Sequence, residues 1–271
     1  MFPKPVMKNL VYCCVFRDAG YMDLLALLLK SMKLKGAFNP ETTDFLLLTH
    51  TSMNDAIGEK ILPLEFFFNL WYLDVHQLMD AARSRLFIFD YPYVDKYDKI
   101  LYIDTDILIN SDINKILDIP IERDIVYAVP EMTLASEYHG GWMYGNHPDI
   151  DLTKPAFSSG ILFFKNCLKI KDMFAAANAH IHDDIAVKGY NPPSCLDQPY
   201  IVFNAAIRNM YNTTTIDEFV RGGRNPEFVE ENVVLYHFAG DIGVSCNKKQ
   251  WMDAFIQKII DFKPVDVSTH N

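Results

Sequence analysis

Short apolar runs alternate with longer leucine- or alanine-rich stretches along the chain. Apolar runs of strand length occupy residues 10–16, 44–50, 99–109, 125–129, 160–165 and 233–238. Apolar positions at helical spacing predict helices over about residues 21–35, 74–89, 168–187, 196–209 and 248–262. This alternation predicts an α/β fold with a mostly parallel central sheet. We expect residues 1–271 to form one domain, because the length suits a single sheet covered by helices.

The run KILYIDTDILI, residues 99–109, carries two aspartates inside an apolar strand. Its flanks are typical of a strand buried on both faces, where an unpaired carboxylate is costly. Asp104 and Asp106 therefore need a metal ion, a basic side chain or the open mouth of a cleft beside them. The other D-x-D triplet, Asp149 and Asp151, lies in the polar stretch NHPDIDLTKP and is expected at the surface.

Composition narrows the range of partners. A formal net charge of -10 and a pI of about 5.2 argue against a nucleic acid or an anionic membrane as the main partner. The five cysteines are odd in number and lack C-x-x-C spacing, so we expect free thiols. The stretch MFPKPVMKNL does not read as a signal peptide, and no apolar stretch has the length of a membrane span. We therefore expect a cytoplasmic protein without a transmembrane segment.

A phosphate-bearing ligand would need an unusual binding site in this chain. Neither G-x-G-x-x-G after the first strand nor G-x-x-x-x-G-K-[ST] occurs, so the common phosphate-binding loops are missing. In sheets of this class, ligands bind beyond the carboxyl ends of the strands. Asp104 and Asp106 lie toward the end of theirs, and a metal held there would reverse the acidic field locally.

Four separated stretches together resemble a known family. They are Tyr21 after the first strand, IDTD at the end of an apolar strand, FSSG and LDQ in the second half, and YHFAG at the end of the last strand. Over about residues 11–243 the chain is similar to glycosyltransferase family eight, the retaining nucleotide-sugar transferases that include glycogenin and galactosyltransferases of lipooligosaccharide synthesis. The resemblance implies a Rossmann-like fold of the GT-A type. It also implies a nucleotide-binding half over about residues 8–110 and a donor-sugar and acceptor half over about 111–271.

The resemblance implies a metal site. Asp104 and Asp106, with Thr105 between them, match the family's D-x-D, and His237 matches its third metal ligand. Two carboxylates and an imidazole suit Mn²⁺, or Mg²⁺, and leave positions for phosphate oxygens. Arg85, in RSRLFIF, matches a basic residue that reaches the nucleotide and the sugar.

Other matches fall on the donor sugar. Asp197 and Gln198 match the family's D-Q pair and are the catalytic candidates, the aspartate near the sugar hydroxyls and the glutamine near C1. Ser158, Ser159 and Gly160 match an N-S-G segment of the sugar pocket, with serine in place of the usual asparagine.

The first strand matches the base-binding end of the family's nucleotide site. Val15, Phe16, Arg17 and Tyr21 would contact the base, with Tyr21 as a stacking partner for uracil. Gly240 completes the matched HFAG segment.

One position departs from the family's pattern. The family often continues H-F-x-G-x-x-K-P-W, and its lysine touches the pyrophosphate, whereas this chain has Gly243 there. Lys248 or Lys249 could take that role after a slip of five residues.

The resemblance implies transfer of a hexose, glucose or galactose, from UDP-glucose or UDP-galactose to an acceptor hydroxyl, with retention at the anomeric carbon. Double displacement and front-face attack both remain open. The alternatives are a catalytically silent UDP-sugar-binding protein and an aspartyl phosphatase, although the latter class expects Thr or Gly where Ile107 and Leu108 stand. No residue pattern marks a glycan, protein or lipid acceptor, and a homodimer is compatible with the sequence.

Overall fold

The computed structural model describes residues 7–189, 191–222, 227–239 and 245–262. Within these residues, the strands form a seven-stranded sheet in the order β3-β2-β1-β4-β7-β6-β8. Its strands are β1 (Lys8–Val15), β2 (Thr43–Thr49), β3 (Asn69–Tyr72), β4 (Tyr97–Ile103), β6 (Val126–Thr133), β7 (Pro155–Lys165) and β8 (Tyr211–Asn212). β3, β2, β1 and β4 are parallel, whereas β7 is antiparallel to both β4 and β6. The predicted α/β fold with a mostly parallel sheet is confirmed.

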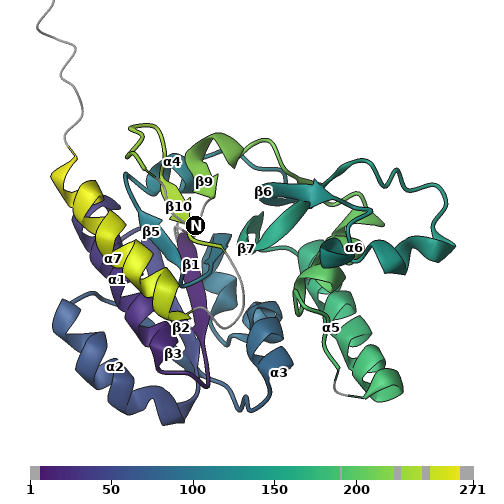
Figure 1. The fold of residues 1–271 in the computed structure, drawn as a ribbon, viewed down its shortest axis with the longest axis horizontal. Helices are drawn as coiled ribbons and strands as arrows, with labels where there is room; N and C mark the ends of the chain where they lie inside the picture. The colour runs from purple at the N-terminus through teal and green to yellow at the C-terminus, as the bar shows by residue number, and fades with distance from the viewer. Residues whose placement is uncertain (1–6, 190, 223–226, 240–244, 263–271) are drawn as a thin grey trace, which may run out of the picture.

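Helices cover both faces of this sheet. Helices α1 (Gly20–Lys35) and α7 (Ser245–Asp261) lie side by side over one part of it, and α5 (Leu168–Lys188) and α6 (Gln198–Ala206) pack together over another (Figure 1). Successive side chains of a strand point to opposite faces. In β1, Val11 and Cys13 accordingly join the core under α1, while Leu10 and Tyr12 join the core that includes α5 and α6. The shorter helices are α2 (Asn54–Lys60), α3 (Leu78–Arg83) and α4 (Asn114–Leu117).

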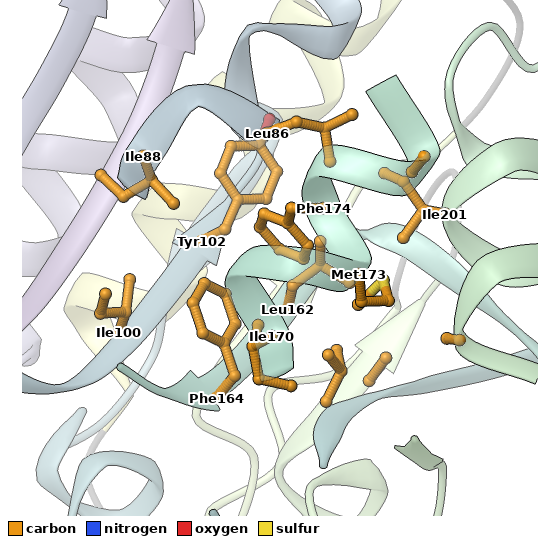
Figure 2. Close-up of a cluster of buried hydrophobic side chains, with 14 of the residues drawn as sticks. Leu86, Ile88, Ile100, Tyr102, Leu162, Phe164, Ile170, Met173, Phe174 and Ile201 are labelled. Carbon is orange, nitrogen blue, oxygen red and sulfur yellow. The ribbon is translucent and has the colours of Figure 1, made fainter. Parts of the chain in front are cut away.

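The core under α5 gives β4 a rigid support. Figure 2 shows Tyr102 of β4 and Phe164 of β7 among the side chains that meet Phe174 of α5. The ring centres of Phe164 and Phe174 are 5.1 Å apart, and the rings are edge-to-face. Such a pair stabilises the fold by about 0.5–1.5 kcal/mol beyond the contribution of the buried area. Because Tyr102 is held by this core, its hydroxyl group has a fixed position near the end of β4.

The predicted strand over residues 99–109 is in fact two strands in two sheets. After β4 the chain enters β5 (Ile107–Ile109), which pairs antiparallel with β10 (Leu235–His237) beside β9 (Val220–Gly222). The Asp104 N–H donates to the Gly160 carbonyl at 2.8 Å, but the Asp106 carbonyl accepts from the Phe238 N–H at 2.8 Å. Both flanks are buried, so the apolar pattern could not reveal where the chain changes its partner strand.

The predicted helix over residues 74–89 is also only partly present. It is the six-residue helix α3 followed by a 3-10 helix over Ser84–Asp90. Leu86, Ile88 and Phe89 are buried there, and tertiary packing routinely overrides a local helix preference. Of the other elements, β7 begins at Pro155, five residues earlier than predicted, and α2, α4 and β3 are too short to have left a clear periodicity.

Three smaller features complete the description. Asp149 and Asp151 are exposed, as predicted. The four cysteines whose side chains are described, Cys13, Cys14, Cys167 and Cys195, are free. Within the described ranges, no helix combines the length and apolar character that crossing a bilayer requires.

Candidate active site

Three side chains with metal-binding groups meet where the two sheets join. Asp104 follows β4, Asp106 precedes β5, and His237 is the last residue of β10. Their ligand atoms all lie within 4.8 Å of one another. The side chains of Asp106 and His237 are only 10% and 9% exposed, whereas that of Asp104 is 32% exposed and forms the open side of the cluster.

This cluster fits a divalent cation. The buried Oδ1 of Asp106 lies 3.4 Å from Nε2 of His237 and has no hydrogen-bond donor among the described residues. Gly160 leaves room beside the ligand atoms, because a Cβ there would lie 2.7 Å from Cε1 of His237 and 2.9 Å from Oδ2 of Asp104. The two carboxylates suit either Mn²⁺ or Mg²⁺, and the imidazole favours a transition-metal ion such as Mn²⁺ over Mg²⁺. A bound cation would also satisfy the free oxygen of Asp106.

The described part of the chain holds a second group that could bind a metal, formed by His50, Asp74 and His76. The side chains of Asp74 and His76 are 84% and 68% exposed. Nδ1 of His50 accepts the Ser52 backbone N–H at 3.1 Å, which leaves the ring proton on Nε2, the nitrogen that faces Asp74. The buried cluster is therefore the better metal candidate.

Lys248, on the first turn of α7, also reaches the buried cluster. Its Nζ lies 2.5 Å from Oδ2 of Asp106, and its side chain is 15% exposed. The next residue, Lys249, instead pairs with Asp253 on the surface of the helix. Of the two lysines that the sequence proposed near the phosphates, Lys248 is the one that lies in the site.

The charges of this cluster stabilise one another. Burial alone would raise the pKa of Asp106, but the positive charges of His237 and Lys248 hold it well below its usual range. Burial would lower the pKa values of His237 and Lys248, but the Asp106 carboxylate raises both. Asp106 is therefore ionised and Lys248 positively charged at neutral pH.

Arg85 links this cluster to the second half of the chain. Its Nε lies 3.0 Å from Oδ2 of Asp197, and its Nη1 donates to the Ser159 carbonyl at 2.7 Å and lies 3.3 Å from Oδ1 of Asp104. The guanidinium also stacks 4.5 Å from the centre of the Tyr102 ring, whose hydroxyl donates to Asp104. These contacts fix one arginine between two carboxylates, as its planar group of donors allows.

Asp197 and Gln198 are engaged by the protein itself. Asp197 is 2% exposed, and burial raises its pKa although Arg85 acts in the opposite direction. Oε1 of Gln198 accepts the Ser159 N–H at 2.9 Å, and its Nε2 lies 3.2 Å from Nε2 of His139. Both side chains therefore hold the start of α6 against β7 and against the Arg85 group.

A cavity of about 670 Å³ opens at the ends of β1 and β4. Most of the residues predicted to contact the donor line it: Val15, Phe16, Arg17, Tyr21, Arg85, Asp104, Thr105 and Asp106, together with Lys248. The remaining described candidates do not line the cavity but lie next to its lining residues Arg85 and Asp104 or next to one another. They are Ser158, Ser159, Gly160, Asp197, Gln198 and His237. Gly240, and the departure at Gly243, lie outside the described residues.

Two backbone positions at the cavity wall are strained. Arg17 and Leu196 have φ angles of 68° and 52°, in the left-handed region that non-glycine residues rarely adopt. Such strain is retained where surrounding structure enforces it, frequently at functional sites.

Sequence reasoning missed three residues of the site. Tyr102 reads as a core aromatic, and its role depends on Asp104 lying within reach of its hydroxyl. His139 is fully buried, and its Nε2 lies 3.3 Å from Oε2 of Glu131, which in turn lies 3.4 Å from Nε2 of Gln198. Glu131 belongs to β6, which extends beyond the predicted residues 125–129, and no motif marked it.

The sequence model of the family described as "Glycosyl transferase family 8" matches residues 68–253 of the chain. This protein belongs to glycosyltransferase family 8. The match covers the site residues from Arg85 to Lys248 but not Val15, Phe16, Arg17 and Tyr21. A search of curated proteins finds no relative of this family 8 chain.

Solved structures support the fold of this family 8 chain. The apo structure of the WbbM bifunctional glycosyltransferase is similar, with a TM-score of 0.58 and 15% identity, over 96% of this chain and 53% of that one. Mouse xyloside xylosyltransferase 1, also in apo form, has a TM-score of 0.53 and 13% identity, over 86% of this chain and 98% of that one. The chain thus spans about half the length of the WbbM structure and most of the length of the mouse enzyme. The fold is of the GT-A type.

Proposed function

We propose that this chain is a retaining glycosyltransferase that moves a hexose from UDP-glucose or UDP-galactose to an acceptor hydroxyl with the help of Mn²⁺. The observation that carries the proposal is the cluster of Asp104, Asp106 and His237 at a cavity that Arg85 and Lys248 also line or border. A carboxylate pair with an imidazole and two cationic side chains suits a metal-bound diphosphate. This arrangement explains how so acidic a chain could hold a nucleotide sugar.

The proposed roles follow from position. Asp104, Asp106 and His237 would hold the cation, which when bound offsets the negative charge of the departing diphosphate. Arg85 would orient Asp104, which it contacts at 3.3 Å, and would reach the sugar end of the donor. In the proposed division, the part up to about residue 110 holds the nucleotide and the part after it holds the sugar and the acceptor.

The base and the sugar of the donor would lie in different parts of the cavity. Tyr21, 37% exposed at the cavity rim, offers a ring face to uracil, next to Phe16 and Arg17. Ser159 and Gly160 lie directly behind Arg85 and Asp104, and the sugar, which follows the diphosphate, would lie on the cavity side of these residues.

The contacts favour front-face attack over double displacement. A double displacement needs a side-chain oxygen free to bond C1. Oε1 of Gln198 is held by the Ser159 N–H, and Asp197 is buried against Arg85. Both residues are therefore proposed to position the sugar wall, with the acceptor entering on the face that UDP leaves.

The alternatives predict different results. A silent UDP-sugar-binding protein would bind the donor without turnover. An aspartyl phosphatase would form a covalent phospho-aspartate at Asp104, which can be trapped and detected. A cytoplasmic location and a homodimer stay predictions.

The test is release of UDP from a panel of UDP-sugars with and without Mn²⁺. Asp104→Asn and Asp106→Asn should each lower the rate by more than about 100-fold, because each removes a metal ligand. Asp149→Asn is the matched control, since it changes the exposed D-x-D. Full activity in either site variant would refute the metal-dependent mechanism. Ligand-induced thermal stabilisation without turnover on any donor would favour the silent binding protein.

A further inference from the structure

Lys248 and the proposed cation compete for the same carboxylate. Oδ2 of Asp106 lies 2.5 Å from the lysine Nζ, and Oδ1 faces His237 at 3.4 Å. A divalent cation bonds carboxylate oxygens at about 2.0–2.6 Å. A cation on Oδ1 of Asp106 would share this carboxylate with the lysine ammonium on Oδ2, so the two positive charges would repel one another at close range.

Among the described side chains, the charges around the cluster are nearly balanced without a metal. Asp104, Asp106 and Asp197 are matched by Arg85 and Lys248, which leaves one net negative charge when the His237 ring is neutral, as a metal ligand must be. A divalent cation alone would reverse that sign. A diphosphate that binds with the cation would make the net charge of the site negative again. The cation and the diphosphate should therefore bind better together than separately.

The ammonium group of Lys248 could also bind a ligand in the cavity. It lines the cavity together with Arg17 and Tyr21, and a lysine side chain is a flexible stem with three donors that suits a phosphate group. Its side chain is 15% exposed, so it can leave Asp106 without moving from a sealed core. The ammonium could therefore pass from the carboxylate to a diphosphate in the cavity.

We propose that Lys248 is a built-in counter-ion of the metal site, which holds Asp106 and weakens cation binding until a nucleoside diphosphate draws it away. The inference rests on the proposed function for the identity of the diphosphate, but its first step concerns the metal site alone. It predicts that the free protein binds Mn²⁺ weakly and that UDP strengthens that binding.

The test is calorimetric titration of the metal-free full chain with Mn²⁺, with and without saturating UDP. The relevant site is the one lost in Asp106→Asn. Lys248→Met should bind Mn²⁺ alone about tenfold more tightly than the wild type, because the like charge that shares the Asp106 carboxylate with the ion is gone. UDP should bind that variant more weakly and should strengthen its Mn²⁺ binding by a smaller factor. Lys248→Gln is the second neutral variant, and thermal unfolding shows whether each variant is folded.

Lys249→Met is the matched control, because its neighbour Asp253 lies on the helix surface and the change alters the total charge equally. It should titrate like the wild type. Equal Mn²⁺ affinity in the wild type and both Lys248 variants, or no Mn²⁺ binding by any of them, overturns the inference whether or not UDP binds. Tighter Mn²⁺ binding by the variants without any UDP binding would refute the proposed function and leave the counter-ion role of Lys248 in place.

Discussion

The guanidinium of Arg85 lies 3.0 Å from the buried carboxylate of Asp197, and this pair joins the segment before β4 to the start of α6. Both side chains are buried, and each is the other's main charged partner. Losing one member leaves a charge without compensation in the core. The pair therefore couples the geometry of the cavity to the stability of the fold.

Arg85→Met should lower the free energy of unfolding by about 3–5 kcal/mol, because Asp197 is left buried without its partner. Arg85→Lys should restore part of this loss, since it keeps the charge but not the fork of donors to Asp197 and Ser159. Chemical denaturation measures both changes. Arg221→Met is the control. It removes an exposed ion pair with Glu230 and should lower the free energy of unfolding by less than about 1 kcal/mol. A loss for Arg85→Met as small as that of the control would contradict the prediction.

Gly160→Ala should weaken Mn²⁺ binding by about tenfold or more, because the added methyl group would displace the His237 ring or Asp104. Calorimetric titration measures the affinity. Gly58→Ala is the control, since nothing lies within 4 Å of a Cβ at that position in α2. It should leave Mn²⁺ binding unchanged and raise stability by up to about 1 kcal/mol. Unaltered affinity in Gly160→Ala would show that the metal binds elsewhere.

Glu131→Gln should change the pH dependence of stability. The hydrogen bond from His139 lowers the pKa of Glu131 below its ordinary 4.5, although burial opposes this. A carboxylate whose pKa is lowered by folding stabilises the protein above its unfolded pKa, and this contribution is lost as the pH falls through the folded pKa. The wild type should exceed the variant in stability at pH 7, and the difference should disappear toward pH 3, in denaturation with EDTA present. A difference that grows on acidification would contradict this.

Cys14 should be nearly inert to alkylation in the native protein. Burial raises the pKa of its thiol to about 12. At pH 8 the thiolate fraction is then about a thousand times smaller than for a free cysteine, since only the thiolate reacts. Peptide-resolved mass spectrometry should show that the labelling rate of Cys14 in the folded protein still rises about tenfold per pH unit above pH 9. In the unfolded control, the labelling rate of the same cysteine should level off there. Rapid labelling at pH 8 in the folded protein would refute the prediction.

The sequence by itself determined the layered fold and much of the proposed site. Apolar runs at residues 10–16 and 44–50 predicted β1 and β2, because strands covered on both faces must be apolar throughout. The same rule made Asp104 and Asp106 conspicuous, since a carboxylate in such a run needs a partner. The family pattern then pointed to His237, and the three groups do lie together.

Only the tertiary structure decided which strands pair and which side chains contact one another in the site. The break of residues 99–109 into β4 and β5 depends on hydrogen bonds to two different strands, which no local pattern records. The choice of Lys248 over Lys249 depends on how α7 faces the cavity, and the engagement of Gln198 depends on Ser159 lying opposite it. Periodicity reports which face of an element is buried, whereas the identity of a contact across the fold is set by packing between distant segments.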